Sequence, residues 1–120
     1  IASSACKRLA ALDARELGYD APASFEFNAY IGPHICASCF ETGPDVAQRF
    51  ASEIGPGCVP DARHVDLEEA LILDFESAGL SRERIASAHA CTKCEPDRFF
   101  SYRASGGVCG RHGALAFRSR

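Results

Sequence analysis

Methionine is absent from the 120 residues, so the chain has no initiator residue. Its first nine residues already have the pattern of a helix interior, without the cap or turn that usually precedes one. No basic stretch followed by an apolar one marks a signal peptide. We therefore expect a fragment, in which residues 1–120 form the C-terminal part of a single domain.

Long apolar runs and an excess of positive charge are also missing. No run approaches the roughly 18 apolar residues that a membrane span needs. The formal net charge is −3 and the isoelectric point about 5.8, whereas a nucleic-acid-binding domain usually exceeds about 9. With 47% hydrophobic and 24% charged residues, the composition is that of a globular domain. We expect neither a membrane span nor a nucleic-acid partner.

Cysteine occurs seven times, an odd number that does not suit a disulfide framework. A chain of this length can also fold on its hydrophobic core alone. Reduced thiols fit better, which predicts a cytoplasmic protein. Several of these cysteines are expected to serve as small apolar core residues.

Apolar residues recur at helical spacing in three segments, 1–17, 44–54 and 66–78. Gly18 and Gly79 are placed to end the first and the third. Asp66 lies three residues before Glu69, the spacing at which a side chain caps a helix. In the second segment, Val46, Phe50 and Ile54 follow one another at spacings of four.

Strands are predicted where apolar and polar residues alternate or where β-prone residues gather. Five segments qualify: 25–30, the surroundings of 63–65, 83–89, 99–103 and 113–118. The order of elements indicates an α+β (mixed α/β) domain, with three helices packed on a mixed sheet. This sheet is expected to continue into sequence outside the chain.

Two C-x-x-C pairs, Cys36–Cys39 and Cys91–Cys94, could together form a Cys₄ zinc site. The usual loop between such pairs has about 15–20 residues, whereas residues 40–90 lie between these two. We therefore favour independent pairs or packed thiols over a shared zinc ion. A redox role for either pair is a further alternative. It is disfavoured because Cys36 lies several residues before the second helix and because Cys94 precedes the acidic, turn-like residues 95–97, which would raise a thiol pKa.

Four arginines near the end alternate with aromatic residues and glycines: Arg98, Arg103, Arg111 and Arg118. An arginine fork matches phosphate oxygens, and glycine-rich backbone can present N–H groups to an anion. The alternative is an exposed charged strand with a glycine turn. His34 follows Gly32 and Pro33 at a predicted strand exit, where α/β sheets place their chemistry.

Three stretches resemble the YfiH-like family, whose members are also called laccase-domain or multicopper polyphenol oxidoreductase proteins and are described as purine nucleoside phosphorylases. The first is Ala29–Ile35 followed by Cys39–Gly43 and Asp45–Val46; the second is Val65–Leu67. The third is Cys91–Thr92, Phe99–Arg103, Gly107 and Gly110–Arg111. The three occur in the family's order and spacing and span most of the chain.

The resemblance implies phosphorolysis of adenosine, inosine or methylthioadenosine, possible adenosine deamination, and phosphate as co-substrate. It implies a zinc ion held by two histidines and one cysteine in the preceding half, so that no metal ligand is expected here. Arg103, Arg111 and His34 are the candidate substrate- or phosphate-binding residues. The chain departs from the family at Ala104 and Gly106.

The resemblance thus predicts an enzyme whose C-terminal half alone is inactive and whose partners are a purine nucleoside, phosphate and the missing N-terminal half. One alternative is a non-catalytic Cys₄ zinc-binding or interaction module, and another is a plain structural domain with reduced cysteines.

Overall fold

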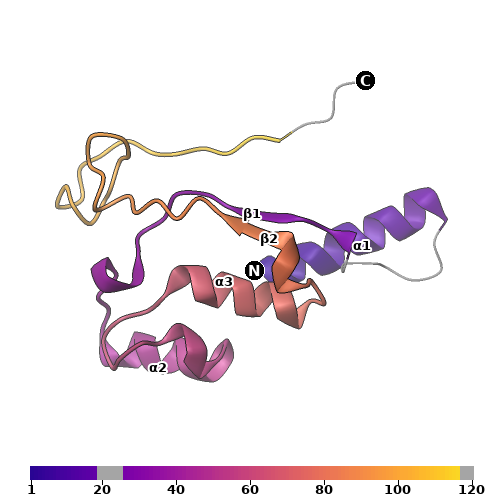
Figure 1. The fold of residues 1–120 in the computed structure, drawn as a ribbon, viewed down its shortest axis with the longest axis horizontal. Helices are drawn as coiled ribbons and strands as arrows, with labels where there is room; N and C mark the ends of the chain where they lie inside the picture. Colours follow the sequence, from indigo (N-terminus) through magenta and orange to yellow (C-terminus); the bar gives the residue numbers. More distant parts are fainter. Residues whose placement is uncertain (19–25, 117–120) are drawn as a thin grey trace.

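A computed structural model describes residues 1–18 and 26–116. Within these residues, three α-helices and two short strands follow one another in the order α1 (Ala2–Leu17), β1 (Ala29–Ile31), α2 (Pro44–Glu53), α3 (Leu67–Ser77) and β2 (Ile85–Ser87). Short 3₁₀ turns lie between them: η2 (Ala37–Cys39), η3 (Pro56–Cys58) and η4 (Arg82–Arg84). The domain is mixed α/β and mostly helical (Figure 1).

The three helices confirm the periodicity, because the residues that bound them are those the sequence indicates. Gly18 adopts a left-handed conformation, with φ of 73°, and its N–H donates to the carbonyl of Ala14. Pro44 occupies the start of α2, where its missing N–H costs nothing. The carboxylate of Asp66 accepts the N–H of Glu69 at 3.0 Å and so caps α3.

In the described part of the chain, the sheet is smaller than predicted and is not mixed: β1 and β2 pair in parallel, with Ala29 opposite Ile85 and Ile31 opposite Ser87. Three further expected strands are wrong within the described residues. His64 makes only isolated bridges, residues 99–103 lie in turns and irregular backbone, and residues 113–116 have no regular structure. The prediction's remaining parts, Phe25 and residues 117–118, lie outside the described residues.

The main hydrophobic core joins α1, α3 and the sheet. Cys6 of α1, Ala29 of β1 and Leu80 are buried together, and Phe75 and Ile85 pack against them. Figure 1 shows α3 running along the strand pair on this side. Cys58 is fully buried beside α2, so two cysteines do serve as small apolar core residues, as predicted.

Among residues 1–18 and 26–116, no helix combines the length and the apolar character needed to cross a membrane.

The parallel crossover places the site. The chain leaves β1, passes through α2 and α3, and returns to β2 in the same direction, so the carboxyl ends of both strands meet at one edge. The ladder continues past the strands: the His34 N–H donates to the carbonyl of Ala90, and the Thr92 N–H donates to that of His34. Residues that follow the two strands therefore become neighbours.

Candidate functional site

An open cavity of about 440 Å³ lies at the carboxyl ends of the two strands. Its walls come from the segments after β1 and β2, from the start of α3 and from the turns after residue 98. His34 and Arg103, which the sequence indicated separately, both line it. Cavities at the carboxyl ends of parallel strands are the usual ligand sites of α/β proteins.

Arg103 is anchored at the wall of this cavity. Its Nη1 donates to the carbonyl of Glu41 at 2.6 Å, and its guanidinium carbon lies 5.3 Å from the ring centroid of Phe40. The two contacts fix the plane of the fork. A guanidinium has five N–H donors, so an anchored arginine still offers a positive edge to an anion.

His34 belongs to a polar cluster around Glu68, in the first turn of α3. Its Nε2 lies 3.2 Å from the Glu68 carboxylate, and its Nδ1 lies 3.0 Å from the carbonyl of Gly32. The hydroxyl of Ser87 donates to the same carboxylate at 2.6 Å, and Nδ1 of His89 lies 3.1 Å from it. Glu68 thus fixes the His34 ring at the cavity and holds the ends of both strands together.

Aromatic rings form another part of the wall. The His112 ring lies 5.7 Å from that of Phe100 and 5.9 Å from that of Phe99, and its Nε2 is 2.8 Å from the carbonyl of Phe100. A Cβ atom at Gly110 would lie 2.6 Å from the Phe100 ring, so a larger residue there would force this ring to move. Phe100 and Tyr102 line the cavity, and more than half of the surface of each residue is exposed.

Arg111 lies differently from Arg103. Its Nη1 donates to the carbonyls of Cys109 and Gly110, both at 3.2 Å, and it is not among the residues that line the cavity. It precedes His112, which does line it. Of the three predicted binding residues, the structure therefore brings two together and leaves the third on the adjoining loop.

The four cysteines of the C-x-x-C pairs converge beside the cavity. All four sulfur atoms of Cys36, Cys39, Cys91 and Cys94 lie within 4.8 Å of one another. The sulfurs of Cys39 and Cys94 are 3.5 Å apart, and the Cys36 N–H donates to the Cys91 sulfur at 3.3 Å. The expectation of independent pairs is therefore wrong: although residues 40–90 separate the pairs in sequence, the parallel crossover brings them to one edge.

The thiols of this cluster have strongly different acidities. Burial raises the pKa of Cys91, but backbone N–H groups of Cys36, Cys94 and Lys93 outweigh it and lower the pKa to about 6. The neighbouring thiols of Cys39 and Cys91 raise the pKa of Cys94 to about 12. Four thiolates this close repel one another unless a cation lies between them.

The set of zinc ligands that the family resemblance implies, two histidines and one cysteine, is not found in the described residues. In residues 1–18 and 26–116, no two histidines and one cysteine gather at ligand distance; the cluster that does gather is all cysteine. The described part of the chain therefore does not fit that zinc centre.

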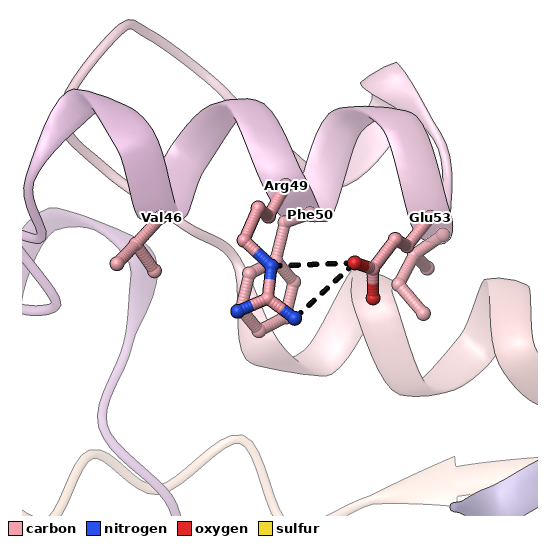
Figure 2. Close-up of a pocket in the computed structure, with 5 residues that line it drawn as sticks. Val46, Arg49, Phe50 and Glu53 are labelled. Carbon is pink, nitrogen blue, oxygen red and sulfur yellow. Dashed lines mark hydrogen bonds and ion pairs between the residues drawn. The ribbon is translucent and has the colours of Figure 1, made fainter.

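A second cavity, of about 230 Å³, lies along α2 (Figure 2). Val46, Phe50 and Ile54 line it together with Arg49 and Glu53, which are joined by a hydrogen bond of 3.2 Å. These apolar side chains recur at spacings of four along the helix, whereas the residue that α2 buries is Ala47. None of the predicted binding residues lies in this cavity.

Sequence reasoning missed Glu68, the centre of the polar cluster. Its signal lay in two histidines, His34 and His89, that follow the two strands. Once these strands are known to be parallel neighbours, a carboxylate between the two rings is expected. The pattern of strands alone did not show that pairing.

Relatives of known activity match most of the chain. Adenosine deaminase RL5, from an unknown prokaryotic organism, is 31% identical over 90 residues, which are 69% of this chain and 34% of that protein. The purine nucleoside phosphorylase YlmD of Geobacillus stearothermophilus is 32% identical over 97 residues, 75% of this chain and 35% of that protein. YlmD of Bacillus subtilis is 30% identical over 89 residues, 69% and 32% of the two chains.

The chain thus spans about a third of the length of these relatives. No solved structure matches it. The family described as multi-copper polyphenol oxidoreductase laccase matches residues 11–119, which include all the residues that line the cavity and both cysteine pairs. By this match, and by relatives that cover more than two thirds of it, the chain belongs to that family, known also as the YfiH-like or laccase-domain family.

Proposed function

We propose that this chain forms part of a purine nucleoside phosphorylase, with the cavity between His34 and Arg103 as a substrate-binding wall. The observation that carries the proposal is that these two residues, distant in sequence, line one cavity at the carboxyl ends of the strands. The names of two relatives, purine nucleoside phosphorylases YlmD, support the reaction class.

Phosphorolysis forms a bond between a phosphate oxygen and C1′ of the ribose, and breaks the bond between C1′ and the purine nitrogen. The bonding electrons leave with the purine, which takes up a proton. An anchored arginine can hold the phosphate dianion and stabilise the charge that develops. We assign this role to Arg103, whose fork is fixed by Glu41 and Phe40.

The aromatic part of the wall suits the purine base. Phe40, Phe100 and Tyr102 line the same cavity as Arg103, and aromatic rings bind a flat base by stacking. His34 lines the same cavity, and the carbonyl of Gly32 and the carboxylate of Glu68 engage its two ring nitrogens, so we assign it the role of shaping the wall rather than of transferring a proton. Arg111 stays a candidate for phosphate binding from the adjoining loop.

The whole activity is proposed for a longer protein, because the chain spans about a third of its relatives. We propose that residues 1–120 are the C-terminal part of one domain and that the preceding part carries the family's zinc ligands. The 120-residue chain alone is then expected not to split inosine or adenosine. The cytoplasm stays the predicted location.

The test is a steady-state assay of the full-length protein with inosine, adenosine or methylthioadenosine, with and without phosphate. Release of ribose 1-phosphate that depends on phosphate supports the proposal. Conversion of adenosine to inosine without phosphate points instead to deamination, the activity that the name of relative RL5 gives. If the folded full-length protein converts none of these nucleosides, the proposed enzymatic function is refuted and a non-catalytic cysteine module is favoured.

A further inference from the structure

The four-cysteine cluster is separate in chemistry from the proposed phosphorolysis. Cys36 precedes the tight turn η2 and Cys39 ends it, and Cys91 precedes and Cys94 ends another turn in the equivalent place after β2. Each sulfur in one pair has its counterpart 55 residues further along. Tetrahedral zinc sites with four cysteine ligands are commonly formed by two such short turns that face each other.

The sulfur positions fit one metal ion better than disulfides. In a tetrahedral zinc site with Zn–S bonds of about 2.3 Å, the sulfurs lie about 3.8 Å from one another. Here all four lie within 4.8 Å, and Cys39 and Cys94 are 3.5 Å apart. A disulfide would need one pair at about 2.05 Å, and all seven cysteines are free.

The backbone around the sulfurs also suits bound thiolates. The N–H of Cys36 donates to the Cys91 sulfur at 3.3 Å, a bond between the two pairs. N–H donors directed at sulfur spread the negative charge of a metal–thiolate centre, and such outer contacts orient the ligands. The four possible ligand atoms of this group are all sulfur. Sulfur ligands bind soft or borderline metals, whereas magnesium and calcium prefer oxygen ligands.

We propose that Cys36, Cys39, Cys91 and Cys94 bind one zinc ion in a closed structural site. Four protein sulfurs fill a tetrahedral shell, so the ion has no open position for substrate. The site ties the segment after β1 to the segment after β2 where the hydrogen-bonded ladder ends at His34 and Cys91. It thereby braces the wall of the cavity without taking part in the reaction.

The experiment compares zinc content between protein variants purified under reducing conditions, by elemental analysis per mole of protein. The wild type and the control Cys109→Ser should hold one more zinc equivalent than Cys36→Ser or Cys91→Ser. A difference between variants is used so that zinc bound elsewhere in the protein cancels. Equal zinc in the wild type and in soluble, folded Cys36→Ser or Cys91→Ser protein would overturn the proposal.

A second pair of variants keeps the test decisive if serine variants fail to fold. Cys94 is the exposed member of the cluster, so Cys94→His has room to supply an imidazole ligand, whereas Cys94→Ala supplies none. We expect Cys94→His to retain the zinc equivalent and Cys94→Ala to lose most of it. If both Cys94→His and Cys94→Ala retained the zinc equivalent, the site would be refuted.

Alkylation of the native protein distinguishes zinc from the other uses of four cysteines. With zinc bound, mass mapping should show Cys36, Cys39, Cys91 and Cys94 protected until a chelator is added, while Cys109 reacts at once. Immediate alkylation of the four before chelation would refute the site. Iron with acid-labile sulfide, copper in place of zinc, or protection reversed only by a reductant would overturn the assignment of zinc.

Discussion

The backbone nitrogen of Cys36 lies 3.3 Å from the sulfur of Cys91, although 55 residues separate the two cysteines in sequence. The contact joins the segments that follow β1 and β2. The two strands themselves pair over only three residues each. So short a sheet gains little from its ladder alone. A metal ion beside it would add a cross-link at the point where the ladder ends.

Removing that metal is expected to loosen one edge of the fold. A metal that binds the folded state stabilises it by mass action, so a zinc chelator should lower the melting temperature of the wild type. Hydrogen exchange should then rise in residues 33–39 and 89–95, and change least in α2. In Cys36→Ser the chelator should have no further effect on these segments. If the exchange rates of residues 33–39 and 89–95 were the same with and without chelator, this prediction would be contradicted.

Arg103 and Arg111 should differ in their effect on turnover. Arg103→Ala removes an anchored cation from the cavity and should cost about 2–4 kcal/mol of transition-state stabilisation in the full-length enzyme. Arg111→Ala should cost less, because its Nη1 is bound to the carbonyls of its own loop. Both values come from kcat/KM with inosine and phosphate.

The matched control for Arg103 is Arg63→Ala. Arg63 also contacts Glu41, with its Nη2 2.8 Å from the carboxylate, but does not line the cavity. If Arg103→Ala lost activity only because Glu41 had lost a contact with an arginine, Arg63→Ala would lose activity as well. Equal kinetics for Arg103→Ala and the wild type would remove Arg103 from the site.

Asp66 should contribute to stability through the helix cap alone. Its carboxylate accepts the N–H of Glu69 at 3.0 Å, so Asp66→Ala should lower the free energy of unfolding by about 1 kcal/mol. Asp66→Ser keeps an oxygen acceptor and should lose less. Chemical denaturation of the three proteins gives the comparison; identical midpoints for wild type and Asp66→Ala would show that the cap is dispensable.

Asp74 should make stability depend on acidity, because it links α3 to the start of α1. Burial raises the pKa of this carboxyl, but hydrogen bonds from Ser3 oppose it, and the pKa lies below its usual 3.8. A lowered pKa stabilises the fold above the unfolded value, and the contribution disappears as the pH falls through the folded value.

Asp74→Asn should therefore be less stable than the wild type above about pH 4, with the difference shrinking as the pH drops further. Urea denaturation at a series of pH values measures it, with Glu83→Gln, an exposed carboxylate, as the control. A difference that stays constant down to the lowest pH would mean that the charge of Asp74 has no part in the link.

The helices could be predicted because local residues determine their ends. Gly18, Pro44 and Asp66 each act within one turn of the backbone, through a left-handed conformation, an absent donor or a side-chain acceptor. Strands depend on distant partners instead. The aromatic run 99–103 is β-prone, but it has no strand beside it in the described residues, so it folds as turns that line the cavity.

The candidate site was predicted in part for the same reason. His34 and Arg103 could be chosen by residue type and local context, but only the parallel crossover shows that they share a cavity. Glu68 and the four-cysteine cluster depend wholly on that crossover. The spacing rule for cysteine pairs failed because it assumes a short connection, whereas here α2 and α3 lie between the pairs.

The parallel register has a consequence for insertions and deletions. Because Ile31 lies opposite Ser87, the two cysteine turns meet only if the links from each strand to its turn keep their lengths. One residue added between Ser87 and Cys91 would displace two sulfurs from the other two. One residue added near Pro60, in the crossover, would leave all four in place. Length variation should therefore be tolerated inside the long connection and not in the short links that leave the strands.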